Sequence, residues 1–454
     1  MKKNLSTYFV LFLSLLAIFS CSRSEDDGYT LSPYAYIKSF SIADIRSSYP
    51  SFTSDGRDTT VVKTVSMGSF AFTINQLTGE IYNNDSLPFA TDVTKVVISL
   101  SAEGVPSIYD DSTSLYEAIS KSDSIDFTAP RKFRVYSNDA QYHKDYTISI
   151  NVHQVDPEMM VWAQMPAVDA VVPVRAIELD GNMYLFGKDS EGAAVVSVTA
   201  IDDANVWSTA GVTGLSVDAL STITVWGGQF YAVASGNLYS SADAKVWEVA
   251  ASGLGAIAIV GASDEAGEIW IAGEQGLLRS KDGGSFEVTE ALPGGFPLYG
   301  VSLMSYPLSH NKEIVRYMLV GYTTAAKDGD VAVWSRLSSE DKWVRYDNEG
   351  NTFTCPALKD VTAVRYNDNL YALGGAGNVN GVNVDAFSSF YVSKDNGIVW
   401  KENTSFYQRL PKELAGNNAP FAIAVDSKNY LWIINAGENG SVWKGIINRL
   451  GFKK

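Results

Sequence analysis

The sequence predicts an all-β chain in which an Ig-like β-sandwich is followed by a six-bladed β-propeller. Residues 34–155 form short stretches of alternating apolar and polar side chains, which is typical of strands with one solvated face. Residues 157–454 repeat one pattern of strand and turn six times. Hydrophobic residues make up 46% of the chain and aromatic residues 12%, which is ample for packed cores and excludes global disorder.

Net charge and residue counts exclude several classes of function. The 454 residues carry a formal charge of −16, and this becomes −18 once Lys2 and Lys3 leave with the leader described below. Such an acidic chain repels nucleic acid and anionic lipid, so we expect no nucleic-acid partner. Two cysteines and three histidines supply neither a disulfide framework nor most metal centres. We therefore expect no cofactor and no metal.

Residues 1–20 have the pattern of a secretory signal peptide. Two lysines precede an apolar run over residues 8–19 that is too short to span a bilayer comfortably, and small Ser20 precedes Cys21. The segment Ile18–Cys21 resembles the lipobox of bacterial lipoproteins. This resemblance implies that Cys21 becomes the first mature residue and carries acyl chains that anchor the protein in a membrane. The alternative is an ordinary secreted protein whose leader ends in cysteine.

Residues 21–33 form an acidic tether. The cluster Glu25-Asp26-Asp27 follows Cys21 closely and is similar to the export signal of Bacteroidota surface lipoproteins. That similarity implies an outer-membrane lipoprotein exposed on the cell surface, whereas the alternative is a solvated spacer without a sorting role. The second cysteine, Cys355, has no partner and is interpreted as a small apolar residue.

Residues 34–155 predict the Ig-like β-sandwich. Strands are expected at residues 34–42, 93–100, 132–136 and 146–152, and seven or so strands in about 120 residues suit this fold. Only Ser112–Ser120 could form a helical turn or two. No Cys…Trp…Cys spacing is present, so an antibody-type domain is excluded. His143 and His153 are interpreted as solvated or packed side chains, and the domain as a spacer.

The six repeats of residues 157–454 each contain an apolar inner strand followed by a strand with a large aromatic residue. The aromatic residues recur every 39 to 61 positions, a spacing typical of propeller blades. They are Tyr184, Tyr231, Trp270, Tyr317, Tyr371 and Trp432. The inner strands are expected at residues 172–179, 222–226, 256–261, 299–304, 361–366 and 421–425.

A turn that ends in an aromatic residue follows the third strand of several repeats. Residues 393–400 read SKDNGIVW and resemble the Asp-box S-x-D-x-G-x-x-W of sialidase-like propellers. Residues 280–286 form a shorter copy, and Asp243 with Trp247 belongs to a decayed one. We expect Ser and Asp to accept or donate hydrogen bonds within the turn and the aromatic residue to pack between sheets. The Asp-box is thus structural and has no catalytic role here.

The two ends of the propeller segment predict how the ring closes. The sixth repeat stops after a third strand at residues 440–443, and residues 159–163 supply a lone strand with an aromatic residue. Pairing of the segments of Trp162 and Trp443 would complete the last blade and remove exposed sheet edges.

Long loops predict the ligand-binding face. They cover residues 322–330, 347–360, 375–388 and 402–420, and long loops on a rigid scaffold commonly carry function. Aromatic residues in or beside them could stack on sugar rings, although they could equally cap the core. With two arginines of the inner strands, the candidate ligand-binding residues are Tyr299, Tyr306, Tyr322, Phe406, Tyr407, Arg175 and Arg365.

A sialidase-type glycosidase is the enzyme alternative. The resemblance to sialidases implies three arginines around a carboxylate, a Tyr–Glu pair and an Asp acid/base. Arg175 lies where those enzymes carry an Arg-Ile-Pro motif, but here a proline precedes it and no Ile-Pro follows. Arg365 occupies the corresponding position of the fifth repeat, whereas Arg316 falls on a second strand. Because no convergent triad is evident, we predict no catalytic residues.

The whole arrangement resembles an uncharacterised group of Bacteroidota surface lipoproteins with an Ig-like domain and a six-bladed, kelch- and sialidase-like propeller. The resemblance is carried by Ile18–Cys21, by residues 146–154 (YTISINVHQ) and by residues 448–452 (NRLGF). It implies location and shape but no catalytic residue. We expect a monomeric, non-catalytic protein that binds glycan or protein ligands in adhesion or nutrient capture and contacts the membrane through its lipid anchor alone. An accessory subunit of a larger surface complex is a further alternative.

Overall fold

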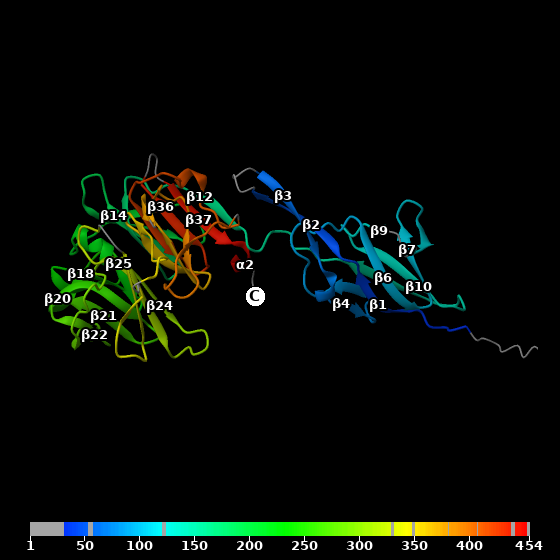
Figure 1. Cartoon of the computed structure of the whole chain (residues 1–454), viewed down its shortest axis with the longest axis horizontal. Coiled ribbons are helices and arrows are strands. Elements are labelled where there is room, and N and C mark those ends of the chain that lie inside the picture. Colours follow the sequence, from blue (N-terminus) through cyan, green and yellow to red (C-terminus); the bar gives the residue numbers. More distant parts are fainter. Residues whose placement is uncertain are drawn as a thin grey trace, which may run out of the picture. The chain divides into compact units, whose positions relative to one another are not determined.

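The computed structural model describes residues 31–52, 58–119, 124–327, 331–346, 350–379, 381–405, 407–436 and 441–451. The chain divides into two compact units, residues 1–156 and residues 157–454, each with its own strands (Figure 1). Among the described residues no helix is both long and apolar enough to cross a membrane. Cys21 and its neighbours, on which the lipidation prediction depends, lie outside these residues.

The first unit consists of strands arranged in two main sheets and a hairpin. Its strands are β1 (Tyr36–Ile42), β2 (Ile45–Phe52), β3 (Asp58–Val65), β4 (Phe72–Asn75), β5 (Glu80–Asn83), β6 (Val96–Glu103), β7 (Val105–Asp110), β8 (Leu115–Ala118), β9 (Ser124–Ile125), β10 (Arg131–Tyr136) and β11 (His143–Ser149), with a 3-10 turn η1 (Met67–Ser69). One sheet has the order β1-β6-β9, the other β4-β5-β11-β10-β7-β8, and β2 pairs with β3.

One hydrophobic cluster joins the two main sheets of this unit. Ile37 of β1, Ile81 of β5 and Phe133 of β10 are all buried in it. The unit is therefore all-β with a single core, while its Ig-like character stays a prediction. The helical turn expected at Ser112–Ser120 is wrong, because residues 115–118 form β8 and pair with β7.

The second unit contains six four-stranded blades that correspond to the six repeats, and the second and third blades belong to one seven-stranded sheet. From the inside outwards, the first blade consists of β13 (Val172–Leu179), β14 (Asn182–Lys188), β15 (Ala194–Ala200) and β16 (Ser208–Gly211), and the second of β17 (Thr224–Trp226), β18 (Gln229–Ala234), β19 (Gly236–Ser241) and the start of β20 (Glu248–Ser263). The third blade consists of the rest of β20 with β21 (Glu268–Gly273), β22 (Gly276–Ser280) and β23 (Glu287–Glu290), and the fourth of β24 (Tyr299–Pro307), β25 (Val315–Tyr322), β26 (Val331–Leu337) and β27 (Val344–Arg345). The fifth blade consists of β29 (Thr362–Tyr366), β30 (Asn369–Leu373), β33 (Tyr391–Ser393) and β34 (Lys401–Glu402), and the sixth of β35 (Phe421–Val425), β36 (Leu431–Asn435), β37 (Ser441–Ile447) and β12 (Met160–Met165).

Short elements complete the unit. They are η2 (Val217–Thr222) before β17, η3 (Lys412–Leu414) before β35, the helix α2 (Asn448–Gly451) after β37, and a three-stranded sheet in the order β28 (Ala357–Leu358), β31 (Gly377–Val379) and β32 (Val382–Val384).

The six blades close into a ring. The inner strands contact one another in the cyclic order β13, β17, β20, β24, β29, β35 and back to β13. Six hydrophobic clusters, one between each pair of neighbouring blades, hold the ring together, and their central aromatic residues include Trp270 and Trp432. The predicted six-bladed β-propeller is thereby confirmed.

Strands from both ends of the propeller segment complete the last blade. β12 pairs antiparallel with β37, so that Trp162 lies opposite Gly445 (Figure 1). The Trp162 ring lies close over Gly445, where a Cβ atom would come within 2.4–2.6 Å of three ring carbons. Its Nε1 donates a hydrogen bond to the carbonyl of Arg409 at 2.7 Å, and it stacks on Phe390 with 6.5 Å between ring centroids. The predicted closure is confirmed.

The turn at residues 393–400 has the predicted Asp-box structure. Asp395 Oδ1 accepts hydrogen bonds from the Ser393 hydroxyl at 2.7 Å and from the backbone N–H of Val399 at 2.9 Å. Gly397 has a φ of +94°, in the left-handed region that favours glycine. Trp400 is buried between the fourth and fifth blades. The hydrogen bonds and the buried ring give the Asp-box a structural role.

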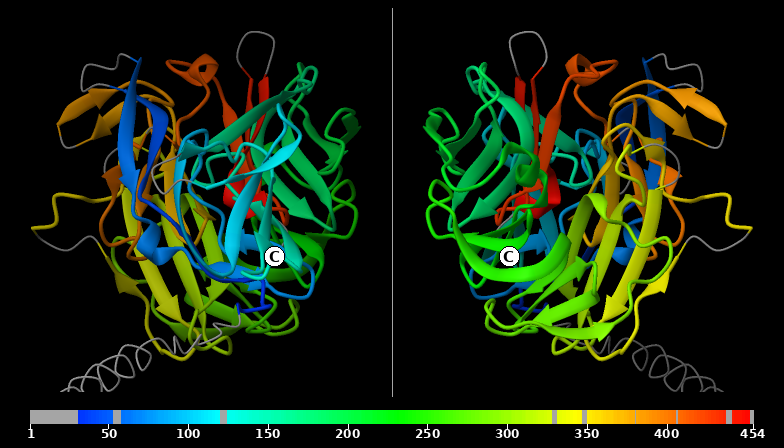
Figure 2. Two further views of the ribbon diagram at one scale, coloured as in Figure 1. Left: turned by 90° about the vertical axis from the view of Figure 1, so that its right-hand side faces the viewer. Right: turned by 90° about the vertical axis from the view of Figure 1, so that its left-hand side faces the viewer.

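β20 is shared by two blades. Its first half pairs with β19 as the outer strand of the second blade, and its second half pairs with β21 as the inner strand of the third. The long strand can be followed in green in the right-hand view of Figure 2. Gly253 and Gly255 lie in this crossing with φ values of +71° and +58°.

Candidate functional site

Two adjoining cavities, of about 390 and 340 Å³, lie at one end of the ring, which we call the mouth. Both are lined by Arg175, Ser221, Gly300, Val301 and Lys327. The first residues of all six inner strands, or the residues just before them, line one or both cavities. The mouth is therefore the entrance to the channel around which the blades are arranged, and its size falls within the range of small-ligand sites.

The inner strands are irregular at the level of the mouth. The register of the β13–β14 pairing shifts between Pro173 and Arg175, and that of β24–β25 between Tyr299 and Ser302. Gly300, in the second of these shifts, has a φ of +56°. Irregularities of the β-bulge type change the direction of side chains and occur often beside functional sites. The second shift leaves Gly300 and Val301 outside the β24–β25 ladder.

Arg175 is the central charged residue of the mouth. It belongs to the first blade, and its Nη1 lies 3.5 Å from the carbonyl oxygen of Val301 on the fourth blade, which is opposite in a ring of six. Its Nε is buried and has no hydrogen-bond partner. Burial lowers the pKa of the Arg175 guanidinium below its ordinary value. Among the described residues no carboxylate lies within 4.0 Å of it.

Four other charged residues line the two cavities. Lys327 Nζ lies 3.3 Å from Asp360 Oδ1, so these two exposed side chains form an ion pair at the rim. Lys188 and Asp218 also line the mouth, from the first blade and from η2 respectively. With Arg175, the described part of the cavity lining therefore has three basic and two acidic residues.

Uncharged groups in the mouth are suited to contacts with a polar ligand. Tyr299, which is partly buried, lines the larger cavity at the start of β24. The hydroxyl of Ser221 also lines both cavities, and its only described bond is with the Asp218 carbonyl at 3.3 Å. Thr222, by contrast, is satisfied within the fold, since its hydroxyl bonds to the backbone of Ala219 and Val233.

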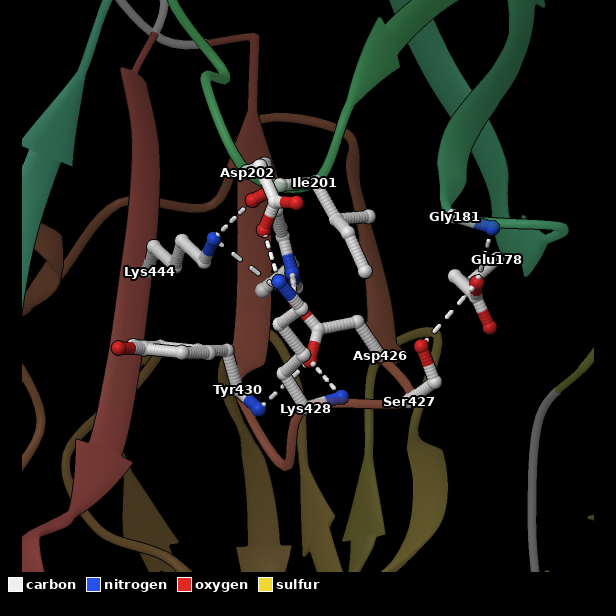
Figure 3. A network of polar contacts seen from close by, with 10 residues as sticks. Glu178, Gly181, Ile201, Asp202, Asp426, Ser427, Lys428, Tyr430 and Lys444 are labelled. Carbon is white, nitrogen blue, oxygen red and sulfur yellow. Dashed lines mark hydrogen bonds and ion pairs between the residues drawn. The ribbon is translucent and has the colours of Figure 1, made fainter. Parts of the chain in front are cut away.

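Charged groups at the opposite end of the ring are paired with one another. The buried carboxylate of Asp426 accepts hydrogen bonds from the backbone N–H groups of Lys428 and Tyr430, each at 2.9 Å, and from Trp432 Nε1 at 2.8 Å (Figure 3). Lys444 Nζ lies 3.9 Å from Asp426 Oδ2. In the same view Lys428 forms an ion pair with Asp202 of the first blade. This network therefore connects the last blade to the first.

The structure separates the candidate residues predicted from the sequence. Tyr299 and Arg175 lie together at the mouth, and Tyr322 lines it too. Tyr322, however, is 2% exposed, and its hydroxyl bonds to the backbone of Leu358 and Val361, which gives it a structural role.

The remaining candidates lie elsewhere. Tyr306 and Arg365 lie at the far ends of β24 and β29, where the Arg365 guanidinium stacks on the Tyr306 ring at 4.4 Å. The Arg365 guanidinium also forms an ion pair with Asp368 at 2.6 Å. Although Arg175 and Arg365 occupy corresponding positions in their repeats, the structure does not bring these two arginines together. Tyr407 lies beside β12, where its carbonyl accepts the N–H of Met160. Phe406 lies outside the described residues.

Several residues of the mouth were not predicted from the sequence. Lys188 and Ser221 lie at strand ends or turns without a recognisable motif, and only that position could have indicated them. Lys327 lies in the predicted loop 322–330 but was not itself identified as a candidate. The structure also shows a cavity of about 780 Å³ beside β30 and β34, lined by polar residues such as Asn369, Asn403 and Gln408. No group of three or more metal-ligating side chains is found among the described residues.

Comparison with solved structures shows weak likenesses. A DUF4623 family protein from Bacteroides eggerthii has 13% identity and a TM-score of 0.31 over 91% of this chain and 98% of that chain. The BP39L lectin from Burkholderia pseudomallei has 12% identity and a TM-score of 0.35, with coverages of 70% and 89%. An α-L-arabinanase from Penicillium chrysogenum has 12% identity and a TM-score of 0.34, with coverages of 63% and 97%. Likenesses at this level carry no argument about function.

Family comparison is more informative. No relative of the chain was found among curated proteins. The family model for the N-terminal domain of DUF6242, a domain of unknown function, matches residues 40–150. The model for the DUF6242 β-propeller domain matches residues 156–454, well over half of the chain. The chain therefore belongs to the DUF6242 family, with its N-terminal domain followed by its β-propeller domain.

Proposed function

We propose that this protein is a non-catalytic glycan-binding protein whose ligand occupies the mouth of the propeller. The observation that carries the proposal is the pair of adjoining cavities, lined by the Tyr299 ring, by Ser221 with one long hydroxyl bond, and by an arginine that has no acidic partner among the described residues. Sugar-binding sites need such a combination of an apolar ring face and hydrogen-bonding groups in a preformed cavity. The location on the outer membrane, through acyl chains on Cys21, is part of the same proposal.

The arrangement of acidic residues favours binding over hydrolysis. Glycosidases use two carboxyl groups about 5–10 Å apart on either side of the scissile bond. Asp218 and Asp360 are the only carboxylate residues in the described lining of the mouth, and they belong to opposite sides of the ring. Asp360 is paired with Lys327.

A sialidase-type arginine triad is also not assembled. Arg175 lies at the mouth and Arg365 at the far end of the channel. Arg316 of β25 binds Ser335 and Tyr346, at 3.1 and 2.9 Å.

A glycan array with the purified protein tests the proposal, and the variant Ser221→Trp shows whether bound glycans occupy the mouth. A tryptophan at this position fills space that both cavities share. The matched control is Ser427→Trp, at an exposed position on the opposite end of the ring. We expect Ser221→Trp to abolish binding and Ser427→Trp to preserve it. Binding that survives Ser221→Trp would place the site elsewhere.

Two further measurements test the remaining parts of the proposal. Release of 4-methylumbelliferone from a sialoside, lost on Arg175→Ala, would overturn the non-catalytic assignment. Incorporation of labelled palmitate that disappears on Cys21→Ala, together with cleavage by protease added to intact cells, is expected for a lipid-anchored surface protein. Capture of a stoichiometric protein partner without any glycan binding would favour an accessory subunit instead.

A further inference from the structure

The guanidinium of Arg175 has unused hydrogen-bonding capacity inside the mouth. An arginine carries five N–H donors, and buried donors in folded proteins are almost always paired. Arg175 has one described hydrogen bond, a long one of 3.5 Å to Val301, and its buried Nε has no partner. By contrast, Arg365, near the far end of the inner strand β29, is partly exposed and is paired with Asp368.

The backbone around Arg175 holds this side chain in the channel. The register shift at Pro173 and Arg175 lies in the first blade, and the shift that leaves Val301 outside the β24–β25 ladder lies directly across the channel. Because both irregularities occur at one level, they place the guanidinium and the opposing carbonyl in the same cavity. A group that bound Arg175 in place of the weak Val301 contact would lie in the centre of the mouth.

The surrounding charges favour an anion at this point. Lys188 lines the smaller cavity with Arg175, and the one acidic residue of its described lining, Asp360, forms an ion pair with Lys327. Arginine binds carboxylates through two parallel N–H···O bonds, which gives both affinity and geometric selectivity. The ligand would thus supply the negative charge that the protein leaves out.

We propose that the mouth selects glycans that carry a carboxylate, such as uronic or sialic acid residues, and that Arg175 binds this carboxylate. The inference rests on the proposed function, since it assumes that a glycan occupies the mouth. Tyr299 and Ser221, which line the same cavities, are available to contact the uncharged part of the sugar.

The test compares trigalacturonate with its methyl ester, and 3′-sialyllactose with lactose, by isothermal titration calorimetry on the purified protein. Each pair differs in the carboxylate while most of the sugar stays the same. We expect at least one acid to bind about 10- to 100-fold more tightly than its neutral partner, and the preference to weaken with added salt. Arg175→Gln should reduce the affinity for the acid to that for the neutral sugar, Arg175→Lys should retain part of it, and Arg365→Gln should change neither.

The outcomes separate this inference from the proposed function. Equal affinity for acids and neutral partners, or an acid preference that persists in Arg175→Gln, would overturn the carboxylate inference while leaving glycan binding in place. Absence of binding to every sugar on the array would overturn both. Tighter binding of a tri-aspartate peptide than of either acidic sugar would assign the anion site to peptides instead.

Thermal unfolding distinguishes a ligand-binding arginine from a structural one. Because Arg175 has no acidic partner among the described residues, Arg175→Gln should keep the Tm of the parent or raise it. A clear fall in Tm for Arg175→Gln with unchanged sugar affinity would show that Arg175 is structural.

Discussion

Gly445→Ala tests whether the contact between the first and last strands of the propeller holds the ring closed. A Cβ at residue 445 would approach three carbons of the Trp162 ring to 2.4–2.6 Å, so the ring must move. Overpacking of this kind costs about 1–3 kcal/mol. Movement also weakens the Trp162–Arg409 hydrogen bond, at roughly 0.5–1.5 kcal/mol. We therefore expect the free energy of unfolding to fall by about 2–4 kcal/mol.

Thermal unfolding of the propeller measures the effect. For a unit of this size the expected loss lowers the Tm by about 3–6 °C. The control is Gly211→Ala, also in a strand, where an added Cβ meets nothing within 4 Å. In a Trp162→Ala background, Gly445→Ala should cost no more than Gly211→Ala. If Gly445→Ala and Gly211→Ala have the same Tm in the parent protein, the argument that Trp162 and Gly445 fix the closure is wrong.

Three more predictions concern buried or hydrogen-bonded groups. Hydrogen bonds from the turn backbone lower the pKa of Asp282 to about 2. The stability that the Asp282 carboxylate contributes is therefore present above pH 4 and is lost as the pH falls towards 2. Asp282→Asn should flatten the curve of stability against pH between pH 4 and pH 2. Glu268→Leu leaves Trp270 Nε1 and the Tyr317 hydroxyl, both 2.8 Å from Glu268 Oε1, without their acceptor, and denaturant titration should show a loss of about 2–5 kcal/mol, with Glu268→Gln losing less. Burial raises the pKa of the Cys355 thiol, so in Cys21→Ala protein Ellman's reagent should modify Cys355 only after unfolding; fast modification of that native variant would contradict the burial of Cys355.

The ring could be predicted because its signals are local and repeated. Each blade has its own apolar inner strand and aromatic second strand, so one weak turn motif, such as the decayed Asp-box with Asp243 and Trp247, leaves the patterns of the other blades intact. Closure also followed from the sequence, since Trp162 begins the segment without a strand to pair with and the sixth repeat lacks an outer strand. The helical turn expected at Ser112–Ser120 failed because cross-strand packing decides there: Tyr116 of β8 contacts Tyr109 of β7, with 5.2 Å between ring centroids.

The candidate site was predicted less completely because register and bulges decide it. Arg175 and Arg365 are alike in the sequence, but only the register of each inner strand shows which is at the mouth. Tyr322 was expected at a ligand surface, yet its hydroxyl satisfies backbone groups between two blades. Lys327, which reaches the mouth from the turn after β25, has no distinguishing neighbours in the sequence.

The continuous strand β20 has a consequence for how a long ligand could be accommodated. Some other passages between blades include extra elements, such as β28 before β29 and η3 before β35. Between the second and third blades the chain makes this passage within a single strand, and residues 256–259 of that strand border the larger cavity. On that side the two blades are joined without a connecting loop. If a glycan binds as proposed, we expect an oligosaccharide longer than the cavity to keep its terminal sugar inside and to extend outwards over β20.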